Sequence, residues 1–234
     1  MNVPRYSLII PSRGDRPKAL GMALDSVLLS ATQAALLPAD VEILVGFDGV
    51  RGKRIHSQSA VRYFDLPADH DFGNGLRQAL LKASRGARLI FLDDDNALTP
   101  QAFSIYEQFP HADMLIARID VSRAHPLPFL PVPEEGKPLI RPCNIDPLCL
   151  CLTQDLVLTR CGGWQGHGYE ADYRNILNYS RRAAHTAVTD QLVGVYDAGR
   201  GLDEGGRNFR QEGLQDPTDV NVPCNVVRAP SSSA

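Results

Sequence analysis

Three consecutive aspartates, Asp93, Asp94 and Asp95, are the residues of this sequence most suited by type and spacing to bind a cation. They directly follow a short apolar run, Leu89–Leu92, which is typical of a buried strand in a mostly parallel sheet. Adjacent carboxylates repel one another and are costly to bury as ions without partners, so they favour water, a helix N-terminus or a bound cation. Ligands of open α/β sheets bind beyond the carboxyl ends of the strands, which is where these acids lie. We therefore expect a cation site; the alternative is a solvated turn in which Asp95 or Thr99 caps the next helix.

The composition is that of an ordinary globular protein. The chain has 234 residues, of which 44% are hydrophobic and 22% charged, enough for one large domain with its own core. A formal net charge of -3 argues against a general nucleic-acid binder, which usually needs a basic field. No apolar run approaches the length of a membrane span, and Met1–Tyr6 lacks the basic and apolar regions of a signal peptide. A cytoplasmic location is the expectation.

Strands and helices alternate in the part of the chain that precedes the aspartates. Apolar runs predict strands at 7–11, 41–47 and 61–65, and helical spacing predicts helices at 18–31 and 76–84. This alternation is typical of a parallel sheet with right-handed crossovers. Beyond the aspartates the pattern predicts a helix at 99–109, a strand at 113–121, a strand and helix start at 149–158, a helix at 169–182 and a strand at 187–196.

The segment from His125 to Pro147 differs from the rest because it contains seven prolines. Proline at this density is expected to exclude regular ladders. The segment is interpreted either as a loop that binds an acceptor or touches a membrane, or as a surface excursion without a binding role.

Several short motifs occur in a specific order along the chain. They are the loop Ile10-Pro11-Ser12-Arg13, the strand end Gly46-Phe47-Asp48-Gly49, the helix start Gly73 to Arg77, the run Phe91-Leu92-Asp93-Asp94-Asp95, the turn Gly162-Gly163-Trp164 and the acidic helix start Tyr169 to Tyr173. Together they resemble the family-2-type glycosyltransferases with the GT-A fold, over about residues 5–197. The resemblance implies a single α/β domain of the GT-A type, with a mostly parallel central sheet flanked by helices. Its nucleotide-sugar-binding half would span about 1–96 and its acceptor-binding half about 97–197, followed by a flexible C-terminal segment at 198–234.

The resemblance also implies roles for individual residues on the donor side. Asp93 and Asp95 match the first and last acids of the family's Asp-x-Asp motif. Asp93 would therefore contact the ribose and the coordination shell of the metal, and Asp95 would bind the cation. Asp94 would be the spacer between them, pointing away, and is counted with the residues around the donor. The other residues that would line the nucleotide-sugar pocket are Pro11, Arg13, Asp48 and Arg77. For Asp48 the alternative is a turn aspartate before glycine, and for Arg77 a solvated helix arginine.

The implied reaction is an inverting, metal-dependent hexosyl transfer from a nucleoside-diphosphate sugar, by default a UDP-sugar, to an acceptor hydroxyl. A divalent cation, Mn²⁺ or Mg²⁺, would stabilise charge on the leaving diphosphate. A carboxylate would act as general base, and the family carries an adjacent Glu-Asp pair at the helix start. Here Ala171 separates Glu170 from Asp172; we favour Asp172 as the base, with Glu170 as the alternative.

The partners and the remaining candidates follow from the same resemblance. The acceptor would be a surface glycan or a lipid-linked sugar, reached by peripheral contact with the inner face of the membrane. His167 and His185 are weaker candidates for a further metal ligand. The glycine-rich stretch 198–212, with Arg200, Arg207 and Arg210, is interpreted either as a segment that closes over the diphosphate or as a tail. Two other functions stay open: a nucleotidyltransferase that makes sugar nucleotides, and a non-catalytic nucleotide-sugar-binding module.

Overall fold

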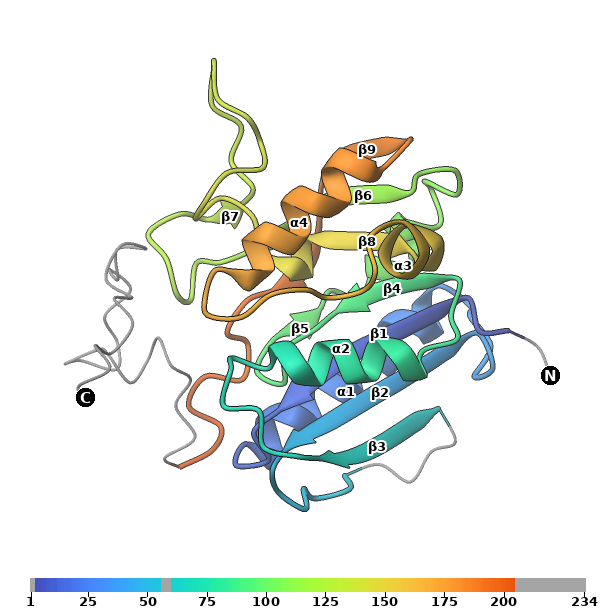
Figure 1. Ribbon diagram of the computed structural model, residues 1–234, viewed down its shortest axis with the longest axis vertical. Helices are drawn as coiled ribbons and strands as arrows, with labels where there is room; N and C mark the ends of the chain where they lie inside the picture. The colour runs from blue at the N-terminus through green and yellow to red at the C-terminus, as the bar shows by residue number, and fades with distance from the viewer. Residues whose placement is uncertain (1–2, 56–59, 205–234) are drawn as a thin grey trace.

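The computed structural model describes residues 3–55 and 60–204, and nine strands in this part of the chain form one sheet. Their order is β3-β2-β1-β4-β8-β6-β9-β5, with β7 paired to β6 beside this path (Figure 1). None of the helices in these residues is long and apolar enough to span a bilayer. The strands are β1 (Tyr6–Ser12), β2 (Val41–Asp48), β3 (Val61–Leu66), β4 (Arg88–Phe91), β5 (Ala97–Leu98), β6 (Met114–Asp120), β7 (Phe129–Leu130), β8 (Leu150–Thr153) and β9 (Thr186–Val195). The helices are α1 (Pro17–Gln33), α2 (Asn74–Ala83), α3 (Ala102–Tyr106) and α4 (Ala171–Arg182), with a 3₁₀ turn η1 (Pro147–Cys149) and a π-helical segment η2 (Asp155–Arg160) on either side of β8.

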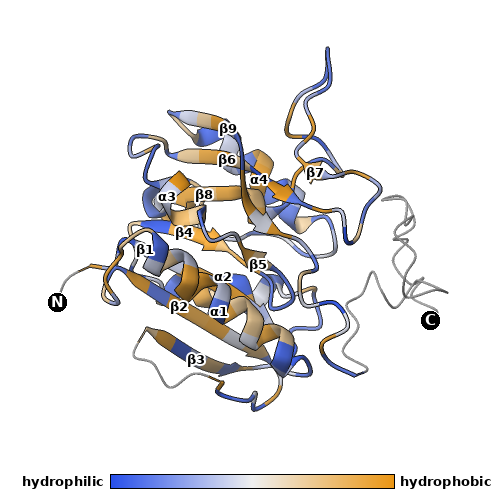
Figure 2. Ribbon diagram, turned by 180° about the vertical axis from the view of Figure 1, so that it is seen from behind, coloured by the Kyte–Doolittle hydropathy of each residue, from blue (hydrophilic) through white to orange (hydrophobic). Residues whose placement is uncertain are grey.

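The first four strands of the sheet path are parallel; β1, β2 and β4 are almost entirely buried, and β3, at the edge, is only partly buried. In the centre, Ile9 of β1 lies opposite Leu44 of β2 on one side and Phe91 of β4 on the other, and all three are almost fully buried. Helices α1 and α3 cover one face of the sheet and α2 and α4 the other (Figures 1 and 2). Figure 2 shows the apolar residues concentrated in these strands, as expected when both faces are covered. Because parallel strands end at the same edge, Ser12, Asp48 and the aspartates that follow Phe91 come to one edge of the sheet.

The predicted fold class is confirmed, but the pairing changes direction beyond β4. Strand β8 pairs antiparallel with both β4 and β6, and β9 runs parallel to β6. The uninterrupted parallel arrangement is therefore a property of the N-terminal half. Strand β8 has only four residues, Leu150–Thr153, and so short an apolar run does not reveal the direction in which it pairs.

The chain directly after the aspartates departs from the prediction. Helix α3 covers Ala102–Tyr106 and does not include Thr99 or Phe109. Ala97–Leu98 form β5, which pairs antiparallel with β9. The Thr99 amide continues this pairing by donating to the Val193 carbonyl at 2.9 Å. The ladder to β9 thus outweighs the local helix-start signal of threonine followed by proline.

The proline-rich segment also departs from the prediction, because it contains a short ladder. Strand β7, Phe129–Leu130, pairs antiparallel with the end of β6 at the margin of the sheet. An edge position tolerates neighbouring prolines because one side of an edge strand needs no donor. Further along, the Asn144 side chain accepts from the Val132 amide at 3.0 Å and donates to the Leu139 carbonyl at 2.8 Å. These hydrogen bonds connect Asn144, near the end of the segment, to Val132 and Leu139 earlier in it.

Candidate functional site

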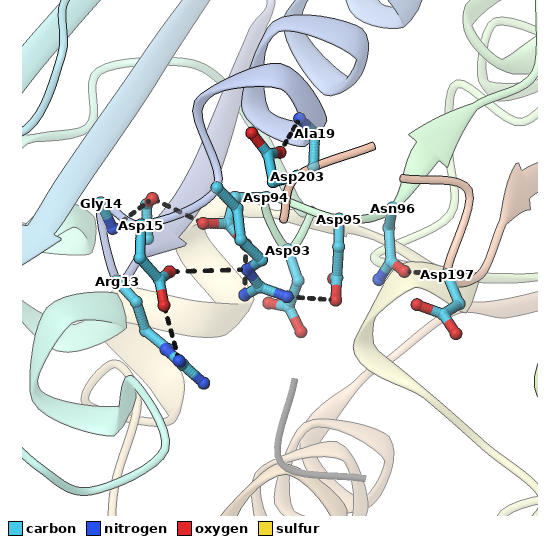
Figure 3. Close-up of polar contacts among 12 residues, drawn as sticks. Arg13, Gly14, Asp15, Ala19, Asp93, Asp94, Asp95, Asn96, Asp197 and Asp203 are labelled. Carbon is cyan, nitrogen blue, oxygen red and sulfur yellow. Dashed lines mark hydrogen bonds and ion pairs between the residues drawn. The ribbon is translucent and has the colours of Figure 1, made fainter. Parts of the chain in front are cut away.

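The three aspartates leave β4 in three different environments. The side chain of Asp93 is 43% exposed, that of Asp94 is 1% exposed and that of Asp95 is 10% exposed. Figure 3 shows them gathered beside the loop that carries Arg13 and Asp15. A solvated turn, the alternative weighed from the sequence, does not describe this arrangement, because two of the three carboxylates are almost fully buried.

Asp94 is the anchor of this cluster and does not behave as an inert spacer pointing away. Its carboxylate accepts from the Ser12 hydroxyl at 2.5 Å and forms an ion pair with Arg16 at 2.5 Å. Burial raises the pKa of Asp94 above its ordinary value, while Arg16 and Ser12 act in the opposite direction. These two contacts tie the end of β4 to the loop that follows β1.

Arg16 is the residue of this site that sequence reasoning missed. It is the N-cap of α1, with Pro17 as the first helical residue, and its guanidinium also donates to Asp95. Burial acts to lower the pKa of Arg16, but Asp94 and Asp95 outweigh it, and the pKa lies above its ordinary value. A signal was available in the sequence, because buried acids need cationic partners and a parallel neighbour strand must end beside them.

Arg77 binds the exposed member of the triplet. It lies in the first turn of α2, donates to Asp93 and to the Phe72 carbonyl, and its guanidinium carbon lies 5.1 Å from the ring centroid of Trp164. Only 7% of the residue is exposed. The alternative of a solvated helix arginine is therefore wrong, while a contact of Arg77 with a donor stays a prediction.

The turn around Trp164 is fastened to α2. The Trp164 indole N–H donates to the Asn74 side chain at 2.9 Å, and its amide donates to the Gln78 side chain at 2.8 Å. Asn74 in turn donates to the Gly168 carbonyl at 3.1 Å. Gly163 has a φ of +91°, and an added Cβ would lie 2.3 Å from the Gln78 oxygen, so this position needs glycine. The turn holds the start of α4 near Arg77.

The two candidate bases at the start of α4 are placed differently. Glu170 is the N-cap of the helix and is exposed. Asp172 is half-buried, and the Tyr173 amide donates to it at 2.7 Å. Burial raises the pKa of Asp172, with Arg77 lowering it and Asp93 raising it further. Asp172 thus lies within electrostatic reach of the pair formed by Arg77 and Asp93.

The remaining residues expected to bind the nucleotide lie at the same sheet edge and already have protein contacts. Asp48, at the end of β2, accepts from the Asp69 amide at 2.6 Å and so shapes the loop after β3. Arg13 is exposed and pairs with Asp15 at 2.6 Å. Pro11 is buried in β1, where an added Cβ at Gly73 would approach it to 3.1 Å. The roles of these residues toward a donor stay predictions.

The segment after β9 passes the aspartates and reaches α1. The Gly199 amide donates to the Asp95 carbonyl at 2.8 Å, and the Asp197 amide donates to the Asn96 side chain at 2.8 Å. The Asp203 carboxylate accepts from the Ala19 amide at 2.9 Å and caps α1 (Figure 3). Residues 198–204 are therefore docked beside the cluster. The rest of the stretch expected to be flexible, including Arg207 and Arg210, lies outside the described residues.

The two histidines make contacts away from the triplet. His167 is exposed and pairs with Asp71 at 2.9 Å, and the His185 backbone pairs with Asp113. Neither has a contact with the three aspartates within residues 3–55 and 60–204.

A divalent cation fits the cluster in ligand type. Asp93 and Asp95 offer the hard oxygen ligands that Mn²⁺ and Mg²⁺ take, and Mg²⁺ sites commonly combine one or two carboxylates with substrate phosphates. Within the part of the chain that the structure describes, no group of three or more His, Cys, Asp or Glu residues is arranged to hold a metal ion by itself. Phosphate oxygens would have to complete the site. Each of the two carboxylates also already accepts from an arginine, Asp93 from Arg77 and Asp95 from Arg16.

Comparison with known proteins shows which solved structures share this fold. No family model and no curated protein matches the chain. Among solved structures, S. aureus TarS 1-349 matches with a TM-score of 0.66 and 14% identity, over 82% of this chain and 60% of that chain. The same fragment has been solved in complex with UDP-GlcNAc, with a TM-score of 0.66. The mannosyltransferase PcManGT from Pyrobaculum calidifontis, in complex with GDP-Man and Mn²⁺, matches with a TM-score of 0.58 and 12% identity, over 84% of this chain and 58% of that chain. The chain thus spans about 60% of the length of TarS 1-349, and at this level of identity the likeness concerns the fold, which is of the GT-A type.

Proposed function

We propose that this protein is a glycosyltransferase that moves a sugar from a nucleoside-diphosphate sugar to an acceptor hydroxyl. The main observation behind the proposal is the cluster of charged residues at one sheet edge, in which Asp93, Asp94 and Asp95 form ion pairs with Arg16 and Arg77. It lies beyond the carboxyl ends of parallel strands, where open α/β sheets bind ligands. Support comes from the solved neighbours, one bound to UDP-GlcNAc and one to GDP-Man.

On this proposal the donor lies along the edge formed by β1, β2 and β4, within residues 1–96. Asp48 ends β2 and Arg13 directly follows β1, where the base and ribose of the nucleotide would lie, and Pro11 lies near the end of β1. Arg77 holds Asp93 in place and directs positive charge to the same point. A UDP-sugar is the default donor. Residues 97–197 would supply the acceptor side, including the start of α4.

Asp93 and Asp95 would hold the divalent cation, Mn²⁺ or Mg²⁺. When bound, such a cation stabilises the negative charge that develops on the leaving diphosphate. The structure solved with GDP-Man and Mn²⁺ supports a divalent cation in this fold. Asp94 contributes indirectly, because its buried carboxylate fixes Arg16 and the loop after β1.

Asp172 would be the general base for a single displacement with inversion. The acceptor oxygen forms a bond to the anomeric carbon while the bond from that carbon to the diphosphate oxygen breaks, and the electron pair leaves with the nucleoside diphosphate. The hydroxyl proton passes to the Asp172 carboxylate. Burial raises the pKa of this group, which makes it a stronger base than an exposed aspartate. Exposed Glu170 is the alternative.

The test is to incubate the purified chain with a panel of UDP- and GDP-sugars and Mn²⁺, and to identify the released nucleotide. Release of nucleoside diphosphate supports the proposal. Release of pyrophosphate would indicate a nucleotidyltransferase, and saturable binding of a sugar nucleotide without any turnover would indicate a binding module. Surface-glycan or lipid-linked acceptors, peripheral membrane contact and a cytoplasmic location stay predictions and are tested by assays with those acceptors and by cell fractionation.

A further inference from the structure

The Arg16 side chain occupies the space between two of the three carboxylates. One guanidinium nitrogen pairs with Asp94 at 2.5 Å and another donates to Asp95. The Arg16 side chain is only 10% exposed, and that of Asp95 likewise. A guanidinium bridging two buried acids is a charge-assisted contact of the strongest kind found between side chains.

Several contacts hold Arg16 in this position. It is the residue that starts α1, so its backbone is part of a helix N-terminus with proline next to it. Asp94, its buried partner, is itself held by the Ser12 hydroxyl. The Arg16 Nε is buried, has no hydrogen-bond partner among residues 3–55 and 60–204, and lies 3.9 Å from an Asp15 carboxylate oxygen. The other two guanidinium nitrogens pair with Asp94 and Asp95, so these contacts set the position of the side chain.

We propose that Arg16 is the resident counter-ion of the aspartate cluster and competes with a divalent cation for the Asp95 carboxylate. The positive charge of Arg16 lies against Oδ2 of Asp95, one of the two oxygens that this carboxylate offers to a cation, and two positive charges a few ångströms apart in a partly buried site repel strongly. The nucleotide-free protein accordingly has a low affinity for Mn²⁺. The relevance of this competition to sugar transfer rests on the proposed function, but the competition itself requires no nucleotide.

The experiment measures Mn²⁺ binding to the nucleotide-free, full-length chain, by the loss of the electron paramagnetic resonance signal of free Mn²⁺. Arg16→Gln should bind Mn²⁺ about tenfold or more tightly than the unmodified chain, because a competing charge is removed. The matched control is Arg160→Gln, which removes an arginine that also bridges two aspartates, Asp113 and Asp155, each at 2.9 Å. Its Mn²⁺ affinity should stay within about twofold of the unmodified chain, since those acids lie away from the cluster.

A second pair of variants keeps the test decisive if Arg16→Gln does not fold, because that change leaves Asp94 buried without its counter-ion. Asp94→Asn alone retains Arg16 on Asp95, whereas Asp94→Asn combined with Arg16→Gln removes both buried charges together. The double variant should bind Mn²⁺ more tightly than Asp94→Asn. Unchanged or weaker Mn²⁺ binding on removal of Arg16, in either background, would overturn the competition. Titration of the same proteins with UDP and GDP tests the proposed function separately, so the two ideas fail independently.

Discussion

Replacing Asp172 by asparagine separates the chemistry of this residue from its structural contacts. The Tyr173 amide donates to one Asp172 carboxylate oxygen at 2.7 Å, and asparagine retains an oxygen that can accept this bond. The change therefore removes a base while leaving the start of α4 intact. A positioned general base contributes about 10²- to 10⁴-fold to rate, which corresponds to about 3–5 kcal/mol of barrier. We expect kcat to fall by this factor with little change in the affinity for donor.

The pH dependence adds a second, independent readout. Burial raises the pKa of Asp172, so activity of the unmodified chain should decline as pH falls, and at a higher pH than for an exposed aspartate. The same shift affects folding with a defined sign. A carboxyl whose pKa is raised in the folded state stabilises the fold at low pH, and this contribution is lost as pH rises through the folded pKa. Asp172→Asn should therefore gain stability relative to the unmodified chain at neutral and alkaline pH, and the gain should vanish in acid.

The assay combines release of nucleoside diphosphate from pH 5 to 9 with urea unfolding over the same range. Glu170→Gln is run beside it, because exposed Glu170 is the rival base. Near-normal turnover by Asp172→Asn, or a large loss confined to Glu170→Gln, would refute the assignment. A drop in stability of Asp172→Asn at pH 8 would contradict the buried-charge reasoning even if activity were lost.

Three further changes test the packing around the site by urea unfolding. Trp164→Phe removes a buried donor from Asn74 and should cost about 1–3 kcal/mol; a loss below about 0.5 kcal/mol would mean that the indole hydrogen bond contributes little. Asp203→Ala removes the cap of α1 and should cost about 0.5–2 kcal/mol, with no effect expected if the segment after β9 does not dock. Gly163→Ala should destabilise more than Gly166→Ala, since both positions have positive φ but only an added Cβ at Gly163 meets another atom; equal losses would argue that backbone strain alone matters.

Much of the fold could be predicted because its signals are local. The apolar runs that became β1, β2 and β4 are buried strands, β3 is a partly buried one, and helices form where the apolar spacing predicted α1 and α2. A parallel sheet brings strand ends to one edge, so the position of Asp93, Asp94 and Asp95 beside Ser12 and Asp48 followed from the order of elements.

Other features depended on which segments meet in three dimensions. Strand β8 joins the sheet antiparallel, and β5 forms directly before the predicted helix start, because each finds a ladder with a strand distant in sequence. Local periodicity carries no information on such partners, and the strands concerned are only two to four residues long.

The different environments of the acidic residues show most clearly what could not be predicted from local sequence. Local sequence is enough to predict that three carboxylates end a buried strand and that two acids begin a later helix. The contacts of Arg16 with Asp94 and Asp95, the partial burial of Asp172 and the exposure of Glu170 arise only when distant segments of the chain pack together. The physical reason is that the environment of a charge is set by burial and by counter-ions, and both are supplied here by residues far away in the chain.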